Sequence, residues 1–152
     1  KMSQNKVNLI LCGLKKNYFS QVNKYINENN LKDNVKYLGN LSLTELIKVY
    51  RHSTAVIIPS LEESSCLLLK ETVGFKKPLI CSDTETFKEK SKIFKIDLYN
   101  KNSVDALQKK IMDIFINKKI KKKNIIKNFK ILKNYEWKKV VDNYFLFFKK
   151  II

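Results

Sequence analysis

The sequence contains almost no arginine and almost no histidine. Arg51 is the only arginine among 31 basic residues, and His52 is the only histidine. The net charge of +17 alone suggests a nucleic-acid partner. Specific readers, however, prefer the bidentate contacts of arginine. Lysine, asparagine and isoleucine are abundant together, as an AT-rich genome produces, so we attribute most of the charge to codon usage. We expect no nucleic-acid partner, and a polyanion-binding module stays as an alternative.

Long apolar runs and regularly spaced cysteines are also missing. No apolar run approaches the roughly 18–20 residues of a membrane-spanning helix, so no such helix is predicted. The cysteines Cys12, Cys66 and Cys81 are odd in number and far apart. Because Cys12 and Cys81 lie in apolar, strand-like runs, we expect buried, reduced thiols in a cytoplasmic protein. Without a CxxC motif or a second histidine, no metal site and no Cys–His catalytic pair is predicted.

The composition that remains is that of an ordered globular protein. The chain has 152 residues, of which 44% are hydrophobic and 11% aromatic, and this predicts a single domain over residues 1–152 with a real core. The sequence starts at Lys1 instead of an initiator methionine and enters a strand-like run by Val7. We therefore expect a piece of a longer protein.

Apolar strands and amphipathic helices alternate along the chain. Such alternation predicts an α/β, Rossmann-like parallel sheet with helices on both faces and C-terminal helices packed against it. The expected strands, of which the first should be central and buried on both sides, are Val7–Cys12, Val35–Leu38, Ala55–Pro59, Leu79–Cys81 and a short one within Lys92–Leu98. The expected helices are Tyr18–Asn29, Leu43–Arg51, a helix after Ser64, Ser103–Ile116 and two C-terminal pieces meeting near Asn134–Tyr135.

Several local signals refine these elements. Ser42 and Glu45 have the spacing of a capping box, and Ser103 resembles an N-cap. Asp83–Ser91 reads as a polar connection without a pattern. The expected inward face of the helix after Ser103 consists of Val104, Leu107, Ile111, Ile114 and Phe115.

Two C-terminal features have a structural and a functional interpretation. The charge run Lys118–Lys123 (KKIKKK) is expected to be a solvated helix surface. The alternative is peripheral contact with an anionic membrane. We expect packing, not function, for the terminal aromatic residues, which are Tyr135, Trp137, Tyr144, Phe145, Phe147 and Phe148.

The stretch from Ala55 to Asp83 carries the clearest chemical pattern. A helix that begins near Ser64 or Ser65 would leave free backbone N–H groups at Ser65, Cys66 and Leu67, which can hold a diphosphate. Glu63 precedes this site, and Glu71 lies about 10 Å along the helix. Carboxylates accept hydroxyl pairs well, so the pattern fits a nucleotide sugar. Spacing alone leaves open that both acids are merely solvated, and it disfavours a glycosidase-type acid pair.

From Val7 to Tyr144 the chain resembles the C-terminal, donor-binding domain of group-1 (family-4) retaining glycosyltransferases of the GT-B fold. The resemblance rests on several short motifs in a fixed order. They are LILCG (Leu9–Gly13), the segment Val35–Ser60, the E-x7-E pair of Glu63 and Glu71, KPLICS (Lys77–Ser82) and the aromatic-Glu-Trp start of a last helix (Tyr135–Trp137).

The resemblance implies a role for each site residue. Glu63 is implied to be the catalytic residue that contacts the transferred sugar, and Glu71 to bind the ribose. Backbone amides of Ser64, Ser65, Cys66 and Leu67 are implied to contact the donor. The implied reaction is retaining transfer of a hexose from a nucleotide-diphosphate sugar, without metal or cofactor.

The resemblance also implies a setting for the chain. We expect part of a two-domain enzyme whose N-terminal acceptor domain is missing here, so the chain alone should be inactive. The expected acceptor is a surface polysaccharide or a glycolipid, and the expected location is the cytoplasm, with association to the cytoplasmic face of the membrane as a further possibility.

Three features depart from the family pattern. Ser64–Cys66 stands where the family has Gly-Phe-Gly, and side chains there could crowd the donor. Lys76 replaces a frequent glycine. The donor-binding Arg and Lys of the family lie upstream of the matched region. A degenerate, non-catalytic domain therefore stays as a second alternative.

Overall fold

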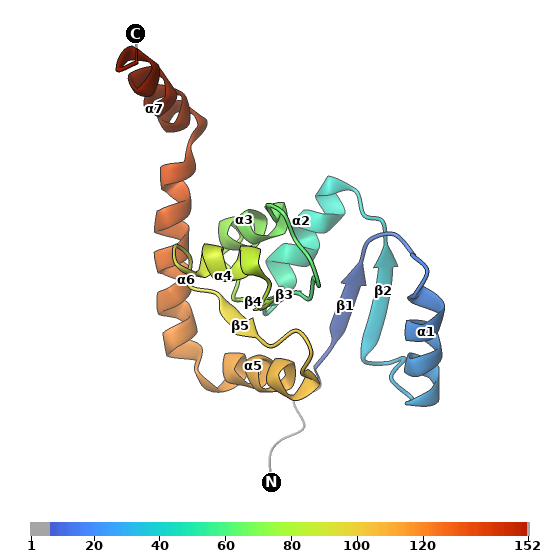
Figure 1. Cartoon of the computed structure of the whole chain (residues 1–152). Helices are drawn as coiled ribbons and strands as arrows, with labels where there is room; N and C mark the ends of the chain where they lie inside the picture. Colours follow the sequence, from blue (N-terminus) through green and yellow to red (C-terminus); the bar gives the residue numbers. More distant parts are fainter. Residues whose placement is uncertain (1–6, 152) are drawn as a thin grey trace. The chain divides into compact units, whose positions relative to one another are not determined.

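The structure is a computed structural model that describes residues 7–151, apart from the side chain of Trp137. The expectations for Lys1 and for the packing of the Trp137 side chain lie outside the described residues. The chain divides into two compact units, Lys1–Val49 and Tyr50–Ile152. The division falls within helix α2 (Leu43–His52). Figure 1 labels the α-helices and the β-strands.

The first unit contains two parallel strands and a helix. Strand β1 (Leu9–Cys12) pairs with β2 (Val35–Gly39), and α1 (Phe19–Glu28) connects them. The predicted strand Val35–Leu38 is confirmed as β2, which ends at Gly39 with a positive φ of 72°. The hydroxyl of Tyr37 donates to the carbonyl oxygen of Gly13 at 2.5 Å, which ties the two strand ends together.

Within the first unit, strand β1 is not buried on both sides as the sequence predicts. Leu9 is 43% exposed, and the Cys12 thiol is exposed instead of buried. An apolar run becomes buried only where other elements cover it. Within the described residues β1 has β2 as its strand neighbour, and α1 contains no buried residue.

Helix α2 begins where the capping box predicts. The backbone N–H of Ser42 donates to Oε2 of Glu45 at 2.9 Å, and the N–H of Glu45 donates to Oγ of Ser42 at 3.4 Å. These reciprocal bonds satisfy two of the donors that a helix leaves unpaired at its start.

The second unit is built on three parallel strands in the order β3–β4–β5. These are β3 (Val56–Ile58), β4 (Leu79–Ser82) and β5 (Asp97–Tyr99), with Ile57 opposite Ile80 and Ile80 opposite Asp97. All four residues of the central strand β4 are buried. The expected strands at 55–59 and 79–81 are confirmed, whereas the last strand begins only at Asp97, near the end of the predicted range 92–98.

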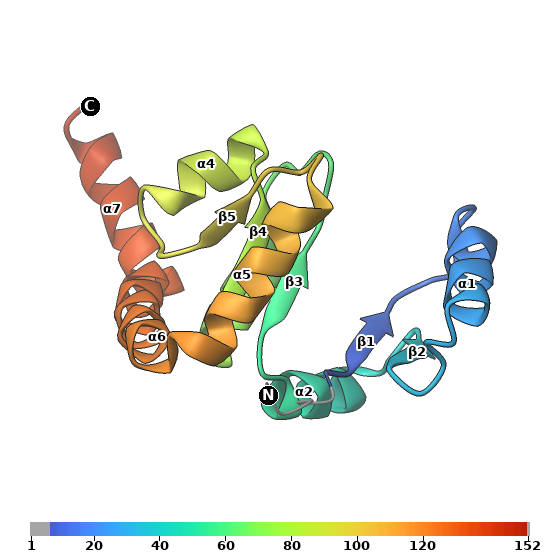
Figure 2. The same ribbon diagram turned by 90° about the horizontal axis from the view of Figure 1, so that it is seen from below.

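Helices cover both faces of this sheet (Figure 2). Because side chains alternate along a strand, Leu79 and Cys81 join one core cluster and Ile80 joins another. The first cluster contains Leu69 and Val73 of α3 (Leu67–Gly74) and Phe87 of α4 (Glu85–Ser91). The second contains Ile114 of α5 (Val104–Ile116). This arrangement confirms the α/β, Rossmann-like class.

The C-terminal elements are α6 (Lys118–Leu132), a short 3₁₀ turn (Lys133–Tyr135) and α7 (Trp137–Lys149). The predicted break near Asn134–Tyr135 is confirmed. Ile131 and Leu132 of α6 pack against the first core cluster. Among the described residues, no helix is long and apolar enough to cross a membrane.

Two predictions about helices are corrected. Asp83–Ser91 contains α4, whose N-cap Thr84 accepts a hydrogen bond from the N–H of Phe87. Phe87 is the one buried residue of α4, and a single buried apolar residue leaves no periodic pattern in the sequence. Val104 is 81% exposed because it occupies the first turn of α5, next to its cap Ser103.

The C-terminal surface also differs from expectation. Within the run Lys118–Lys123, Lys121 is buried, and its Nζ lies 2.5 Å from Oδ2 of Asp97. Tyr135 stacks on Phe94 with ring centroids 6.1 Å apart. In α7, four of the aromatic residues that were expected to pack are exposed within the described residues. The exposed ones are Tyr144, Phe145, Phe147 and Phe148.

Candidate functional site

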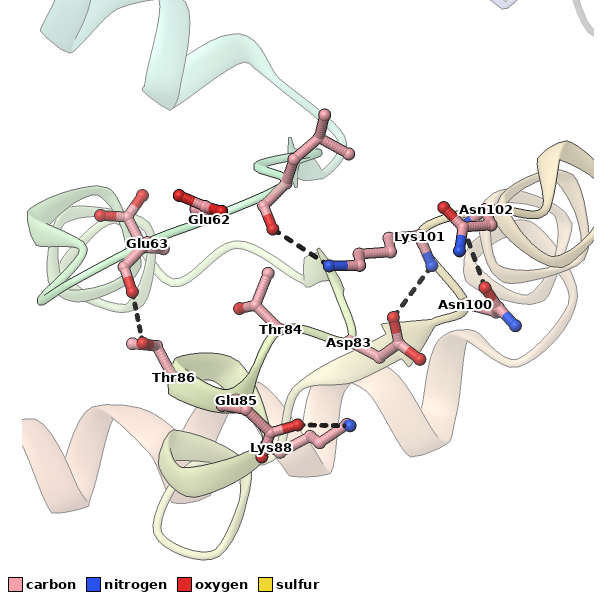
Figure 3. A pocket seen from close by; sticks show the side chains of 11 residues that line it. Glu62, Glu63, Asp83, Thr84, Glu85, Thr86, Lys88, Asn100, Lys101 and Asn102 are labelled. Atoms are coloured by element: carbon pink, nitrogen blue, oxygen red, sulfur yellow. Dashed lines mark hydrogen bonds and ion pairs between the residues drawn. The ribbon is translucent and has the colours of Figure 1, made fainter.

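The three parallel strands of the second unit end at one edge of the sheet, and a cavity opens there. Parallel α/β sheets bind ligands in the crevice outside the carboxyl ends of their strands. The cavity has a volume of about 440 Å³ (Figure 3). It is lined by the segments that follow β3, β4 and β5, namely residues 61–63, residues 83–86 with Lys88, and residues 100–102.

Glu63 lines this cavity and is half-buried. Its Oε2 accepts a hydrogen bond from Oγ of Ser60 at 3.3 Å, and its Oε1 accepts one from the N–H of Ser64 at 3.2 Å. Its backbone carbonyl accepts a hydrogen bond from Oγ1 of Thr86, which joins the loop after β3 to the start of α4. The carboxylate is therefore held from its own loop, in a residue that lines a polar cavity.

The opposite wall of the cavity is organised by Lys101. Its backbone N–H donates to Oδ1 of Asp83 at 2.9 Å, and its Nζ donates to the carbonyl oxygen of Leu61 at 3.3 Å. These bonds link the segments after all three strands (Figure 3). Nearby, the N–H of Asn102 donates to Oδ1 of Asn100 at 2.9 Å.

The remaining wall carries an ion pair. Nζ of Lys88 lies 2.8 Å from Oε1 of Glu85. The hydrogen bond from Lys88 lowers the pKa of Glu85, and the same bond raises the pKa of Lys88. With its carboxylates, amides, hydroxyls and ammonium groups, the cavity offers the donors and acceptors that bind the hydroxyl groups of a sugar.

Helix α3 begins later than the sequence predicts, at Leu67 instead of Ser64 or Ser65. Cys66 precedes it with φ 42° and ψ 84°, in the left-handed region. Ser65 and Cys66 therefore lie before the helix. The first-turn amides belong to Leu67 and Leu68, while the N–H of Leu69 donates to the carbonyl of Cys66 at 3.3 Å. The positive end of the helix dipole lies at these first amides.

The Cys66 side chain belongs to the core and not to the surface of the loop. It is 4% exposed and packs in the first core cluster. Burial raises the pKa of its thiol, and the nearby N–H groups of Leu69 and Leu68 offset this only in part. The thiol is therefore protonated near neutral pH and is a poor nucleophile.

Glu71 lies on the second turn of α3 and is held by a tyrosine. It follows Leu67 by four positions, about 6 Å along the helix axis instead of the 10 Å expected from an earlier helix start. Oε2 of Glu71 accepts a hydrogen bond from the hydroxyl of Tyr50 at 2.9 Å. Tyr50 is 6% exposed, and its ring stacks on Phe75 with centroids 4.8 Å apart.

Comparison with known families identifies the chain. The model of the family described as glycosyl transferases group 1 matches residues 1–132. The chain belongs to this family. No curated protein matches it.

Solved structures share the fold of this group-1 domain at low sequence identity. Sucrose-phosphate synthase from Thermosynechococcus elongatus superposes with a TM-score of 0.79 at 16% identity, over 95% of this chain and 38% of that one. TarM gives 0.75 at 19% identity, over 93% and 28%. HepE from Anabaena, solved in complex with UDP and glucose, gives 0.74 at 18% identity, over 92% and 39%. The chain thus spans well under half of these proteins.

The predicted site residues of the group-1 domain lie in two places, at the cavity and along the start of α3. Glu63 precedes the start of α3 in the sequence and lines the cavity. Glu71 follows the start of α3 and pairs with Tyr50. Ser64 donates its amide to Glu63, and Leu67 begins the helix. Within residues 7–151, no group of three His, Cys, Asp or Glu side chains is arranged to hold a metal ion.

Sequence reasoning missed the residues of the other cavity walls. Asp83, Lys101 and the two asparagines beside it have no motif of their own. Each lies a few residues after a predicted strand, so the carboxyl ends of the strands were the available signal. Tyr50 lies in a helix that the sequence predicts, but nothing in the sequence pairs it with a residue 21 positions later.

Proposed function

We propose that this domain binds a nucleotide-diphosphate sugar for retaining glycosyl transfer. One observation carries the proposal. Two half-buried carboxylates, Glu63 and Glu71, flank the first turn of α3 at the carboxyl end of β3. An anion held at that helix N-terminus would have one acid before it and one after it. A nucleotide-diphosphate sugar matches this order, because its diphosphate lies between a sugar and a ribose that each offer hydroxyl groups to a carboxylate.

In the proposed complex, the amides of Leu67 and Leu68 face the diphosphate. They stabilise the negative charge that develops as the bond between the anomeric carbon and the diphosphate oxygen breaks. A bond from the anomeric carbon to the acceptor hydroxyl forms on the same face of the sugar, and the hydroxyl proton leaves with the diphosphate. Glu63 accepts hydrogen bonds from the sugar, and Glu71 accepts them from the ribose.

The wider setting is also part of the proposal. Because the chain spans 28–39% of the similar solved proteins, we place the acceptor site in a separate N-terminal domain, so the chain alone should show no turnover. We propose hexose transfer to a surface polysaccharide or a glycolipid in the cytoplasm, without a metal. The exposed lysines of α6, such as Lys118 and Lys122, would favour contact with an anionic membrane surface.

Nucleotide titration tests the proposal. The full chain is titrated with UDP, GDP and ADP by calorimetry, and UDP is the first choice because HepE was solved with UDP and glucose. We expect one of them to bind, and Glu71→Gln to weaken its binding at least tenfold. Glu89→Gln, on the exposed surface of α4, is the matched control and should bind like the wild type. Absence of binding at millimolar nucleotide, or equal binding by Glu71→Gln, would refute the assignment.

A further inference from the structure

We propose that Tyr50 is a positioning residue for recognition of the ribose. Its hydroxyl fixes the Glu71 carboxylate so that Oε1 is presented to the ribose hydroxyls in a defined direction. The inference rests on the proposed function, because it concerns the same donor site. It adds a residue from a different helix, α2, to a site that the sequence places in a single strand–loop–helix segment.

The hydrogen bond is of ordinary length and is partly buried. The Tyr50 hydroxyl donates to Oε2 of Glu71 at 2.9 Å. Burial in the first place, and the neighbouring Glu71 in the second, raise the pKa of Tyr50. The phenol therefore keeps its proton and acts only as a donor toward the carboxylate. Hydrogen bonds to a charged acceptor are stronger than neutral ones.

Two further contacts support Tyr50, a ring stack and a hydrogen bond to the neighbouring residue of α2. Its ring lies parallel to Phe75, with an interplanar angle of 4°, and Phe75 directly follows α3. The next residue of α2, Arg51, accepts a hydrogen bond at its carbonyl from Nζ of Lys77 at 2.7 Å. The last turn of α2 is thus bonded to both ends of the segment Glu71–Lys77.

This geometry matters because a glutamate has three rotatable bonds. Without a partner, the carboxylate of a half-buried glutamate samples several directions, and ordering it on binding costs conformational entropy. A buried donor that engages Oε2 removes this cost before the ligand arrives. Within the described residues, the bond to Tyr50 is the one found for the Glu71 carboxylate, so Oε1 stays available to a ligand.

The test compares nucleotides with and without ribose hydroxyls. The full chain and its variants are titrated with the nucleoside diphosphate that binds best among UDP, GDP and ADP, and with its 2′,3′-dideoxy counterpart. Tyr50→Phe retains the ring and its stack, and should weaken binding of the ribonucleotide roughly tenfold. It should leave binding of the dideoxynucleotide unchanged. In the Glu71→Ala background, Tyr50→Phe should have no further effect. The exposed Tyr25 gives the control Tyr25→Phe.

The outcomes separate the two claims. If Tyr50→Phe binds the ribonucleotide as well as the wild type does, or loses both nucleotides equally, the positioning role is refuted and the proposed function stands. If the wild type binds no nucleoside diphosphate, both are refuted. Phe75→Leu provides a second variant should Tyr50→Phe not fold. It removes the stack but not the hydrogen bond, and should give a smaller loss that is again selective for the ribonucleotide.

Discussion

The backbone conformation and the burial of Cys66 favour different types of residue. Its backbone is left-handed at φ 42°, which favours glycine, while its side chain is 4% exposed and part of the core. Lys76 has a similar φ of 55° and also stands where the related pattern often has glycine. The chain therefore keeps the backbone path of a glycine-containing loop with residues that adopt it at a cost.

Substitutions at Cys66 should reveal this cost. Cys66→Gly and Cys66→Ala both remove the buried thiol, but only glycine relieves the left-handed backbone. We expect the glycine variant to be about 0.5–1 kcal/mol more stable than the alanine variant, because left-handed strain of ~1–2 kcal/mol exceeds the entropic cost of glycine. Urea unfolding measures the difference. An alanine variant that is as stable as the glycine variant would contradict the left-handed conformation.

The three thiols should differ in reactivity. Cys12 is exposed, whereas Cys66 and Cys81 are buried. Burial raises the pKa of Cys66 and Cys81, and partial desolvation raises the pKa of Cys12 as well, so accessibility is what separates Cys12 from the other two thiols. Since the thiolate is the reactive form, iodoacetamide at pH 8 should modify Cys12 first and the other two only in urea. Above about pH 8.5 unfolded thiols ionise while the buried ones stay protonated, so the free energy of unfolding should fall. Peptide mass spectrometry reads the modification, and early labelling of Cys81 would show that β4 is not buried.

At the scale of elements, polar contacts connect α6 to the strand edge at β5. Lys121 pairs with Asp97 of β5, and both side chains are largely shielded from solvent. The amide of the buried Asn128 bonds the backbone of Lys95 twice, at 2.6 Å to its N–H and at 2.9 Å to its carbonyl. A lysine-rich helix is thus anchored to the core at two specific polar points.

Two neighbouring lysines on α6 allow a matched comparison. Lys121→Ala leaves the Asp97 carboxylate shielded without its partner, and we expect a loss of stability of about 1–3 kcal/mol. Lys122→Ala removes an exposed lysine of the same run and should change stability by less than about 0.5 kcal/mol. Urea unfolding of both variants gives the result. Equal stability would mean that the ion pair contributes nothing.

The sequence predicted elements best where the signal was local. The capping box at Ser42 and the cap at Ser103 needed only neighbouring residues, and both helices begin as expected. The start of α3 was missed because the left-handed Cys66 has no signature in its residue type. The exposure of β1 was missed because burial depends on which elements cover a strand. Likewise, the E-x7-E spacing singles out Glu63 and Glu71 as candidates, whereas Asp83 and Lys101 meet only in the folded chain.

At the scale of the whole molecule, charge is the dominant property. The formal charge of +17 comes from 31 basic and 14 acidic residues, so any polyanion is attracted at low salt. The proposed donor site, by contrast, uses backbone amides and carboxylates. These two kinds of binding respond differently to ionic strength.

A change in salt concentration should therefore distinguish polyanion binding from binding at the proposed donor site. Binding of a labelled DNA duplex, followed by fluorescence anisotropy, should fall steeply with salt and vanish near 150 mM, because lysine contacts to phosphates release counterions. Binding of the preferred nucleoside diphosphate should change by less than about threefold over the same range. Tight DNA binding that persists at physiological salt would favour the polyanion-binding alternative.

Hydrogen–deuterium exchange with and without the preferred nucleoside diphosphate tests the location of the donor site most directly. The method reports backbone amides, which are the groups that α3 offers to the diphosphate. We predict that the nucleotide slows exchange in peptides covering residues 61–71, including the amides of Leu67 and Leu68, and leaves residues 118–132 of α6 unchanged. Protection confined to the lysine-rich α6, with residues 61–71 unaffected, would contradict the assignment.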